Sequence, residues 1–407
     1  MRQADGISIA SDVKGNGPGN RHGPCKRFAS LFMMQAKGEV MMERDDVAQK
    51  LNAKSACDDE ATGLVKVLLR GDAFNVNGIS TLADHDGRRL TELEFDYLGD
   101  SSCSLFRVHV PGGKYGYLDV TGKFAIEPLY DYAQDFSEDM AWVTRGGKLY
   151  ILDRSGGETE PEALPNGEYA VVEPFFEGLA RVSTLNLGGF WGFMSLAYYH
   201  DDSDNAGLWG YVDKRGKVIV PPQYIFAENF SGGFAIVCKG KWTIDKKWDN
   251  KYNQGRYWSE EMKWGAIDRN GVEAIPCLFE EIKWRPWGPD YPSSEAVITK
   301  RYLAAMDENG KWGIIDLKGN WVVAPQFEDV GYESDTSPNG DMFVFYGRKI
   351  WGGGDPDDTP CGVYSISKQK VLVPAEKYRD IEFVSDFEIR VSDNSKWTNY
   401  VTIPIPE

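Results

Sequence analysis

One sequence motif recurs along the chain and limits what the chain can fold into. Its fullest copy, residues 208–237, reads LWGYVDKRGKVIVPPQYIFAENFSGGFAIV. It holds a Trp-Gly pair, an Asp with a Gly three residues later, a Pro, an aromatic residue, and a Phe-Ser pair before an alternating apolar run. A unit that recurs in a fixed order predicts a repeat architecture instead of several unrelated domains.

The copies are located by the Asp and the Gly that follows it. Four copies are clear, and their marker residues are Asp119 and Gly122, Asp213 and Gly216, Asp268 and Gly271, and Asp316 and Gly319. Weaker copies have Asp84, Asp153 and Ser365 at the marker position. Successive markers lie 35, 34, 60, 55, 48 and 49 residues apart, so a short basic unit is lengthened by insertions in the second half of the chain.

Each unit is expected to contain three short strands. In the fullest copy these are Trp209–Asp213, Lys217–Val220 and Phe234–Val237. The Asp is expected to accept backbone hydrogen bonds across a tight turn, and the Gly to take the left-handed conformation that closes it. The Gly after the Trp is expected to make room for an aromatic ring of the next unit.

The composition also favours β structure. The chain of 407 residues contains 44 Gly and 20 Pro, which is typical of many turns between short strands. We expect an all-β array of about seven three-stranded antiparallel modules. Because the basic unit is shorter than a four-stranded propeller blade, an open, curved, solenoid-like array is favoured over a closed propeller-like ring.

The chain is expected to divide into four segments. Residues 1–24 are rich in Gly and polar residues and are expected to be a disordered leader. Residues 25–74 are expected to hold a helix around Met41–Leu51 that caps the array, because a terminal repeat needs its apolar face covered. Residues 75–391 are the repeat array, and residues 392–407 form a C-terminal capping strand.

The motif resembles the WG-repeat family of bacterial proteins. The family consensus is a Trp-Gly strand, an Asp-x-x-Gly turn, a strand that ends in Pro and a Phe-Ser link, and the resemblance covers about residues 75–391. It implies a binding or interaction repeat and does not identify a ligand.

Strand parity predicts where the insertions lie. An odd number of strands reverses the chain at every unit, so one link must cross the module, and the longest regular link is around Tyr224–Gly233. The four insertions would then emerge on one face: Ser195–Gly207, Thr243–Met262, Gly352–Pro360 and Trp284–Ser294. Loops that grow on one face of a repeat scaffold usually carry the binding function.

The insertions contain more large aromatic residues than exposed loops normally have. These candidate binding residues are Tyr198, Tyr199, Trp248, Tyr252, Tyr257, Trp258, Trp284, Trp287 and Tyr291. Flat rings with nearby acids suit a protein or a glycan ligand. The alternative is that these rings pack against one another, as the repeated Trp of each motif is expected to do in the core.

Charge and cysteine usage exclude several functional classes. The net charge of -17 argues against nucleic acid, which needs a basic face. No apolar run suits a signal peptide or a membrane-spanning helix, so we expect no membrane insertion and a cytoplasmic location. The six cysteines are scattered, which predicts free, buried thiols and no metal or cofactor.

Catalytic motifs are absent from the sequence, since neither a G-x-S-x-G nor an H-E-x-x-H pattern occurs. The leading interpretation is therefore non-catalytic recognition of a protein or glycan by the aromatic loops. Two alternatives stay open, which are a hydrolase that uses carboxylates of the same loops and a pure structural scaffold. The sequence leaves the ligand and the oligomeric state open.

Overall fold

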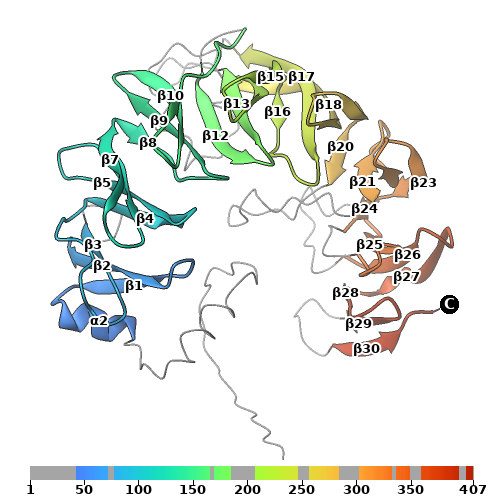
Figure 1. Cartoon of the computed structure of the whole chain (residues 1–407). Helices are drawn as coiled ribbons and strands as arrows, with labels where there is room; N and C mark the ends of the chain where they lie inside the picture. The colour runs from blue at the N-terminus through green and yellow to red at the C-terminus, as the bar shows by residue number, and fades with distance from the viewer. Residues whose placement is uncertain are drawn as a thin grey trace, which may run out of the picture. The chain divides into compact units, whose positions relative to one another are not determined.

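The computed structural model describes residues 43–71, 78–165, 169–184, 207–245, 256–283, 302–331, 336–348, 359–393 and 400–406; the side chains of residues 242–259 lie outside this description. The chain divides into two compact units, Met1–Val40 and Met41–Glu407, and all described residues belong to the second. The expected all-β class is confirmed, because the described residues form antiparallel sheets with one short helix (Figure 1).

The helix, α2 (Arg44–Lys50), is followed by eight sheets, none of which closes on itself. The first four sheets are β1 (Ser55–Asp59), β2 (Leu64–Arg70) and β3 (Ile79–Ala83); β4 (Tyr97–Ser102), β5 (Leu105–His109), β6 (Tyr115–Asp119) and β7 (Phe124–Tyr130); β8 (Tyr132–Ala133), β9 (Met140–Arg145), β10 (Lys148–Asp153) and β11 (Glu158–Thr159); and β12 (Val171–Phe176), β13 (Leu179–Thr184), β14 (Leu208–Asp213) and β15 (Val218–Tyr224).

The last four sheets follow the same plan. They are β16 (Phe226–Ala227), β17 (Phe234–Asp245), β18 (Arg256–Asp268) and β19 (Glu273–Phe279); β20 (Glu281–Lys283), β21 (Tyr302–Met306), β22 (Trp312–Asp316) and β23 (Trp321–Phe327); β24 (Asp329–Val330), β25 (Met342–Tyr346), β26 (Cys361–Ser365) and β27 (Lys370–Tyr378); and β28 (Asp380–Phe383), β29 (Glu388–Ser392) and β30 (Val401–Pro404). In every sheet the strands pair in chain order.

The predicted three-stranded module is wrong, because six of the eight sheets have four strands. The missed strand is the first one of each sheet, which is as short as two residues in β8, β16 and β24. The link around Tyr224–Gly233 is therefore not a crossing, since Ile225 alone separates β15 from β16. With four strands, every unit keeps the same orientation without a long connection.

The Gly of each Trp-Gly pair packs against backbone of the fourth strand in its own sheet. A Cβ on Gly116 would lie 2.9 Å from the Ile126 oxygen, and one on Gly313 would lie 2.6 Å from the Val323 oxygen. The expectation that this Gly faces an aromatic ring of the next unit is therefore wrong. The fourth strand bulges at its Pro, where no ladder hydrogen bond is needed, and the bulge passes over the bare glycine.

The Asp-x-x-Gly turns join the third and fourth strands. In the turn of the fifth sheet, Asp268 Oδ1 accepts hydrogen bonds from the Asn270 and Val272 amides, at 2.8 and 3.0 Å, and these bonds lower the pKa of Asp268. Gly271 has a φ of +79°, and its Cα lies against Val220 of the preceding sheet. The turn glycine therefore meets two demands, a left-handed backbone and close contact with a neighbouring sheet.

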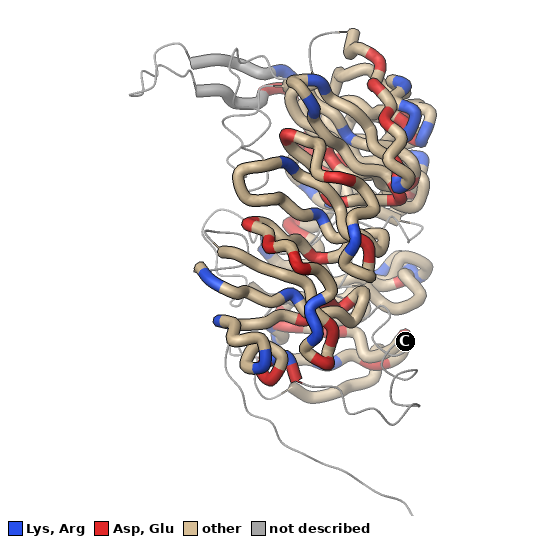
Figure 2. Tube along the Cα trace, turned by 60° about the vertical axis from the view of Figure 1, so that its left-hand side comes forward, with Lys and Arg blue, Asp and Glu red and all other residues tan. Residues whose placement is uncertain are grey.

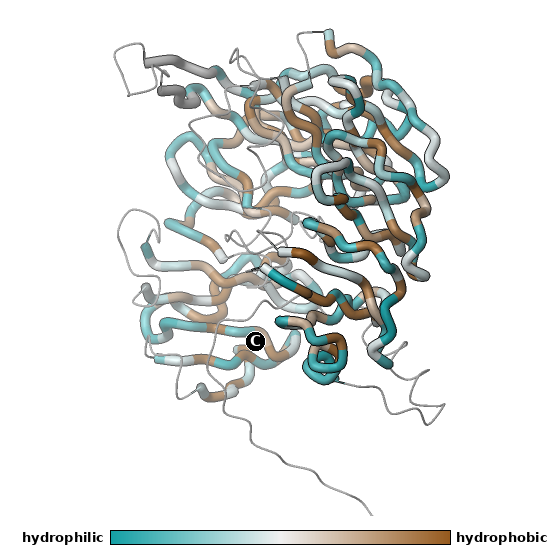
Figure 3. The backbone as a smooth tube through the Cα atoms, turned by 90° about the vertical axis from the view of Figure 1, so that its left-hand side faces the viewer, coloured by the Kyte–Doolittle hydropathy of each residue, from teal (hydrophilic) through white to brown (hydrophobic). Residues whose placement is uncertain are grey.

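A separate apolar core fills each junction between consecutive sheets. Figure 3 shows hydrophobic positions alternating with hydrophilic ones along the chain. Between the second and third sheets it contains Tyr117, Tyr130 and Phe136, and between the fourth and fifth it contains Tyr211, Tyr224 and Phe230. The helix covers the first sheet, since Val47 packs with Val65, Val67 and Ala83. Every core thus joins nearest neighbours along the chain.

Glutamates in the turns between first and second strands accept hydrogen bonds from backbone amides of the next sheet. The Glu138 carboxylate accepts hydrogen bonds from the Glu177 and Gly178 amides, at 2.5 and 2.7 Å. Glu177 in turn accepts from the Gly232 and Gly233 amides, at 2.7 and 2.8 Å. Each glutamate also forms an ion pair, Glu138 with Lys214 and Glu177 with Arg269. Figure 2 shows basic and acidic residues interspersed along the trace.

Strand order defines two ends of each sheet. We call the end with the first-to-second and third-to-fourth hairpins the turn end, and the opposite end the loop end. The insertions Ser195–Gly207, Thr243–Met262 and Gly352–Pro360 each connect a second to a third strand, and the described strand ends that flank them lie at the loop end; residues 195–206, 246–255 and 352–358 lie outside the described residues. Residues 284–301, which include Trp284–Ser294, lie outside the described residues, so the face on which they lie stays a prediction; the strand ends that flank them, Lys283 of β20 and Tyr302 of β21, lie at the turn end.

Replacing the Gly of a Trp-Gly pair should destabilise the protein through this close backbone contact. We expect Gly313→Ala to lower the free energy of unfolding by about 3 kcal/mol, because the new methyl group forces β22 and β23 apart. Gly112→Ala, where no atom lies within 4 Å but φ is +67°, should cost only about 1 kcal/mol. Urea denaturation measures both, and equal losses would contradict the proposed role.

Removing the charge of Glu177 should weaken its hydrogen bonds and its ion pair with the next sheet. We expect Glu177→Gln to cost about 2 kcal/mol at neutral pH, and the exposed Glu127→Gln to cost little. Burial opposes ionisation of Glu177, but the Arg269 and backbone hydrogen bonds outweigh it and lower its pKa. Its contribution is therefore present above about pH 4.3 and lost as pH falls through the folded-state pKa. Urea titrations against pH should show this component in the wild type and not in Glu177→Gln.

Candidate functional site

Most of the nine aromatic residues singled out from the sequence lie outside the described residues. The structure describes the backbone of Tyr257 and Trp258 but not their side chains. Both residues belong to β18, where they pair with Ile244 and Thr243, respectively. Tyr198, Tyr199, Trp248, Tyr252, Trp284, Trp287 and Tyr291 fall in the undescribed segments. Their role in binding stays a prediction.

The second and third strands of the fifth sheet form an arm. β17 has 12 residues and β18 has 13, whereas the equivalent strands β21 and β22 have five each. Their ladder runs from Phe234 opposite Asp268 to Asp245 opposite Arg256, beyond the point where β16 and β19 stop pairing. The insertion Thr243–Met262 is thus in part a paired ribbon at the loop end.

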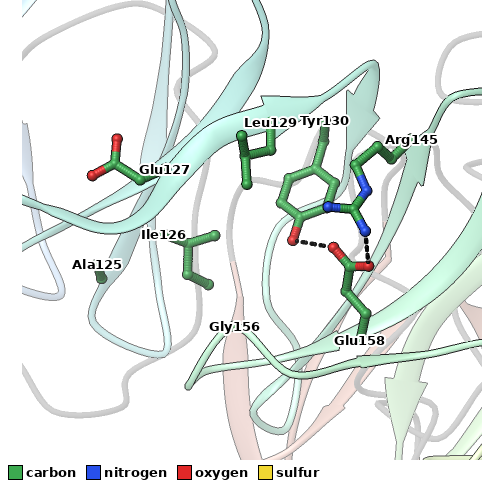
Figure 4. A pocket seen from close by; sticks show the side chains of 8 residues that line it. All are labelled: Ala125, Ile126, Glu127, Leu129, Tyr130, Arg145, Gly156 and Glu158. Atoms are coloured by element: carbon green, nitrogen blue, oxygen red, sulfur yellow. Dashed lines mark hydrogen bonds and ion pairs between the residues drawn. The ribbon is translucent and has the colours of Figure 1, made fainter.

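A shallow pocket of about 440 Å³ lies between the second and third sheets (Figure 4). Its polar groups are already joined, because the Tyr130 hydroxyl donates to Glu158 at 3.0 Å and Arg145 pairs with Glu158 at 2.6 Å. Burial, followed by the contact with Glu158, raises the pKa of Tyr130. Glu127 and Leu129, both exposed, also line the pocket.

The ion pair and the position of the tyrosine recur two sheets further along the chain, which favours a structural role. Lys239, the sixth residue of β17, pairs with Glu273, the first residue of β19, as Arg145 of β9 pairs with Glu158 of β11. Tyr224 holds the position of Tyr130. A group that repeats at equivalent junctions is better explained as a structural contact between strands than as a binding site.

The loop ends of the third strands β6, β14, β18 and β22 carry the repeated aromatic residue, and the three Trp rings among them are in contact with a cation or another ring. Arg181 lies 4.7 Å from the ring centre of Trp209, and Lys283 lies 4.7 Å from that of Trp312. Trp264 stacks on Phe226 at 5.9 Å. The expectation that the repeated Trp is first a packing residue agrees with this geometry.

The second sheet differs, and it holds a group that the sequence analysis missed. His109 Nδ1 lies 2.6 Å from Asp96 Oδ1, and its ring centre lies 4.5 Å from that of Tyr115. Tyr97 and Tyr132 each lie 6.2 Å from Tyr115. The sequence gave one weak signal of this group. His109 ends its strand, and its partners on the two neighbouring strands, Tyr97 and Tyr115, are both aromatic.

A cation is buried beside this aromatic group. The Arg107 guanidinium donates to the Tyr97 hydroxyl and to the Ala133 oxygen, and it pairs with Asp135 at 3.0 Å. Burial raises the pKa of Asp135, although Arg107 opposes the shift. Arg107 joins the second sheet to the third through its hydrogen bond to the Ala133 oxygen and its ion pair with Asp135.

Other chemistry has little support among the described residues. They contain no group of three His, Cys, Asp or Glu side chains arranged to hold a metal ion. Cys57, Cys103, Cys238, Cys277 and Cys361 are free thiols, and burial raises the pKa of Cys238 to about 12 and that of Cys277 to about 11. Such thiols are poor nucleophiles at neutral pH. No described helix is both long and apolar enough to cross a bilayer.

Comparison with known proteins supports the repeat motif. The model of the WG containing repeat matches residues 115–148, 209–248, 264–285 and 312–335. These segments cover the third strands β6, β14, β18 (in its last residues) and β22, and the turns that follow them. No curated protein matches the chain.

Solved structures give only distant likenesses. A eukaryotic initiation factor matches at 10% identity and a TM-score of 0.37, over 87% of this chain and 88% of the other. BamB from Moraxella catarrhalis matches at 10% identity and 0.29, over 90% and 98%. The computationally designed Ika8 protein matches at 10% identity and 0.27, over 75% and 85%. Scores this low carry no argument about function.

If the hydrogen bond from Tyr130 to Glu158 is only structural, its loss should affect stability and not binding. We expect Tyr130→Phe to lower the free energy of unfolding by about 1 kcal/mol, because one buried hydrogen bond to a carboxylate is removed. Capture of a partner by the immobilised chain should be unchanged. Reduced capture with unchanged stability would instead favour the pocket as a binding site.

Proposed function

Because this chain is built on WG repeats, we propose that it is a non-catalytic scaffold that binds a protein or a glycan through the loop end of its sheets. Repeated sheets with separate cores tolerate insertions at one end without loss of fold. The strand order supports the proposal, since three of the four insertions connect a second to a third strand and the described strand ends that flank them lie at the loop end.

The arm of the fifth sheet is the strongest support for a contact with another macromolecule. Beyond Lys239 its two strands pair only with each other among the described strands. A two-stranded ribbon is marginally stable in water by itself. The arm also contains Trp242, Trp258 and Tyr257, and aromatic residues of this kind dominate binding energy at interfaces.

A hydrolase is the second candidate. The His109–Asp96 pair supports it, because a carboxylate that orients a histidine is part of many acid–base sites. The described residues supply no nucleophile hydrogen-bonded to this histidine, so the binding role is favoured. Turnover of glycans or esters by the purified chain, lost in His109→Gln, would reverse this preference.

Shortening the arm should abolish binding and leave the fold intact. We expect a variant in which a two-residue Asn-Gly turn replaces Lys241–Glu261 to unfold cooperatively like the wild type, because the fifth-sheet core lies before the arm. It should capture at least about tenfold less of its partner from a lysate of the native host.

The matched control is a variant shortened in residues 285–299, which connect the first strand β20 to the second strand β21 and lie outside the described residues. It should retain capture. If the two variants capture equally well, the proposed role of the loop end is refuted.

A further inference from the structure

In every sheet one row of paired residues starts at the second residue of the first strand and ends at the position of the repeated glycine. Five sheets have glycine there: Gly116, Gly210, Gly265, Gly313 and Gly362. In the eighth sheet the row is Ile381, Val391 and Val401. A side chain therefore stands where a bare backbone lets the fourth strand pass in the other sheets, and Val401 is 58% exposed.

The residue at this position varies together with the length of the fourth strand. All five sheets with glycine have a fourth strand of seven to nine residues. The third sheet has Tyr150 there, and its fourth strand β11 has two residues. The first sheet has Thr81, and its fourth segment is described only as isolated bridges. Val401 therefore extends a series in which a side chain at this position limits pairing with a fourth strand.

Proline interrupts the outer edge of β30. The Ile405 amide donates to the Phe387 oxygen at 2.8 Å, so Ile405 belongs to a hydrogen-bonded pair. Because such pairs alternate along antiparallel strands, the backbone of Pro404 is directed away from β29, toward the edge that no described strand covers. Pro404 has no N–H to donate to a further strand, and Pro406, two residues later, has none either. Proline on an edge strand protects a sheet against unwanted pairing.

The face of the eighth sheet opposite its core also differs from that of interior sheets. In the second and fourth sheets, Tyr117 and Tyr211 follow the glycine and donate to oxygens of the next sheet. Thr402 stands at this position in β30 and is exposed. Its partner is Arg390, at the place where Arg107 pairs with Tyr117. The last strand therefore lacks the side chain that would reach a further sheet.

The arginine of this face contacts its own sheet. Arg107 donates to a main-chain oxygen of the following sheet. Arg390 instead donates to Glu382, with Nε 2.8 Å from Oε2, and lies 4.9 Å from the ring centre of Tyr400. The Tyr400 hydroxyl donates to Asp380. The polar groups of this face are thus joined to one another, and a polar outer face is what a terminal repeat needs in order to stay soluble.

We propose that the eighth sheet terminates the array and keeps the chain from associating through its last strand. Val401 and Pro404 close the edge to a further strand, and the joined polar groups cover the outer face. A second copy of the chain then finds no site at which to continue the sheets. The repeat scaffold therefore acts as a single particle. This inference does not depend on which ligand the loop end binds.

The first test opens the edge with Pro404→Thr and Pro406→Thr together in the full chain. Threonine restores both amides and favours extended structure. In sedimentation velocity the wild type should stay monomeric at all concentrations. The weight-average mass of the double variant should rise about twofold with concentration, because two open edges pair by mass action. Its circular dichroism should match that of the wild type, which separates association from unfolding.

Pro111 supplies the matched control for the edge variant. It is also exposed, and it lies in the hairpin between β5 and β6, outside both strands. Pro111→Thr should stay monomeric, because it restores an amide that no strand edge presents.

The second test opens the face. Arg390→Leu with Glu382→Leu replaces an ion pair by apolar side chains on the outer face of the last sheet. This variant should associate more strongly than Lys148→Leu with Glu160→Leu, which replaces an exposed ion pair of the third sheet in the same way.

Three results would overturn the inference. The first is a wild type that associates and becomes monomeric on Phe387→Ser, since Phe387 is the most exposed of the large apolar residues described in the last sheet, at 79%. The second is a double proline variant that stays monomeric. The third is equal association of the two leucine variants. A monomeric wild type, with association in the edge and last-sheet face variants alone, supports the inference.

Discussion

The close approach of two backbones at the glycine after each repeated aromatic residue is the constraint on which the repeat depends. With no side chain at Gly116 or Gly313, the bulged fourth strand can pass directly over the third. The same bulge turns the chain toward the next sheet, so that one residue suffices to join them. The Gly and the Pro of the motif are therefore two halves of one contact, although they lie about twelve residues apart in the sequence.

Packing between sheets depends on the residues that follow this glycine. Tyr117 and Tyr211, which follow the glycine, are fully buried, and their hydroxyls donate to the oxygens of Gln134 and Glu228 in the next sheet, at 2.6 Å in each case. Arg107 and Arg181 reach across in the same direction, to the oxygens of Ala133 and Ala227. Each short first strand is thus held by the sheet before it as well as by its own second strand.

The sequence alone predicted the repeat and the all-β class, because the motif residues act locally in turns and strands. It did not predict the fourth strand, since a pair such as Phe226–Ala227 is too short to show any periodicity. That omission invalidated the parity argument, on which the predicted common face of the four insertions depended. The sequence also missed His109 with Asp96, because a cross-strand pair between residues 13 apart leaves no local pattern. The loop aromatic residues were identified by composition, and their binding role remains a prediction.

The nearest-neighbour arrangement of the cores has a consequence for biosynthesis. A sheet that leaves the ribosome needs only the sheet made just before it as a docking surface, and α2 with the first sheet supplies the initial one. The chain can therefore become structured in the order in which it is translated, with little waiting for distant segments. By the same logic, unfolded sequence exposed at any moment should be limited to about one repeat, which reduces the chance of aggregation during synthesis.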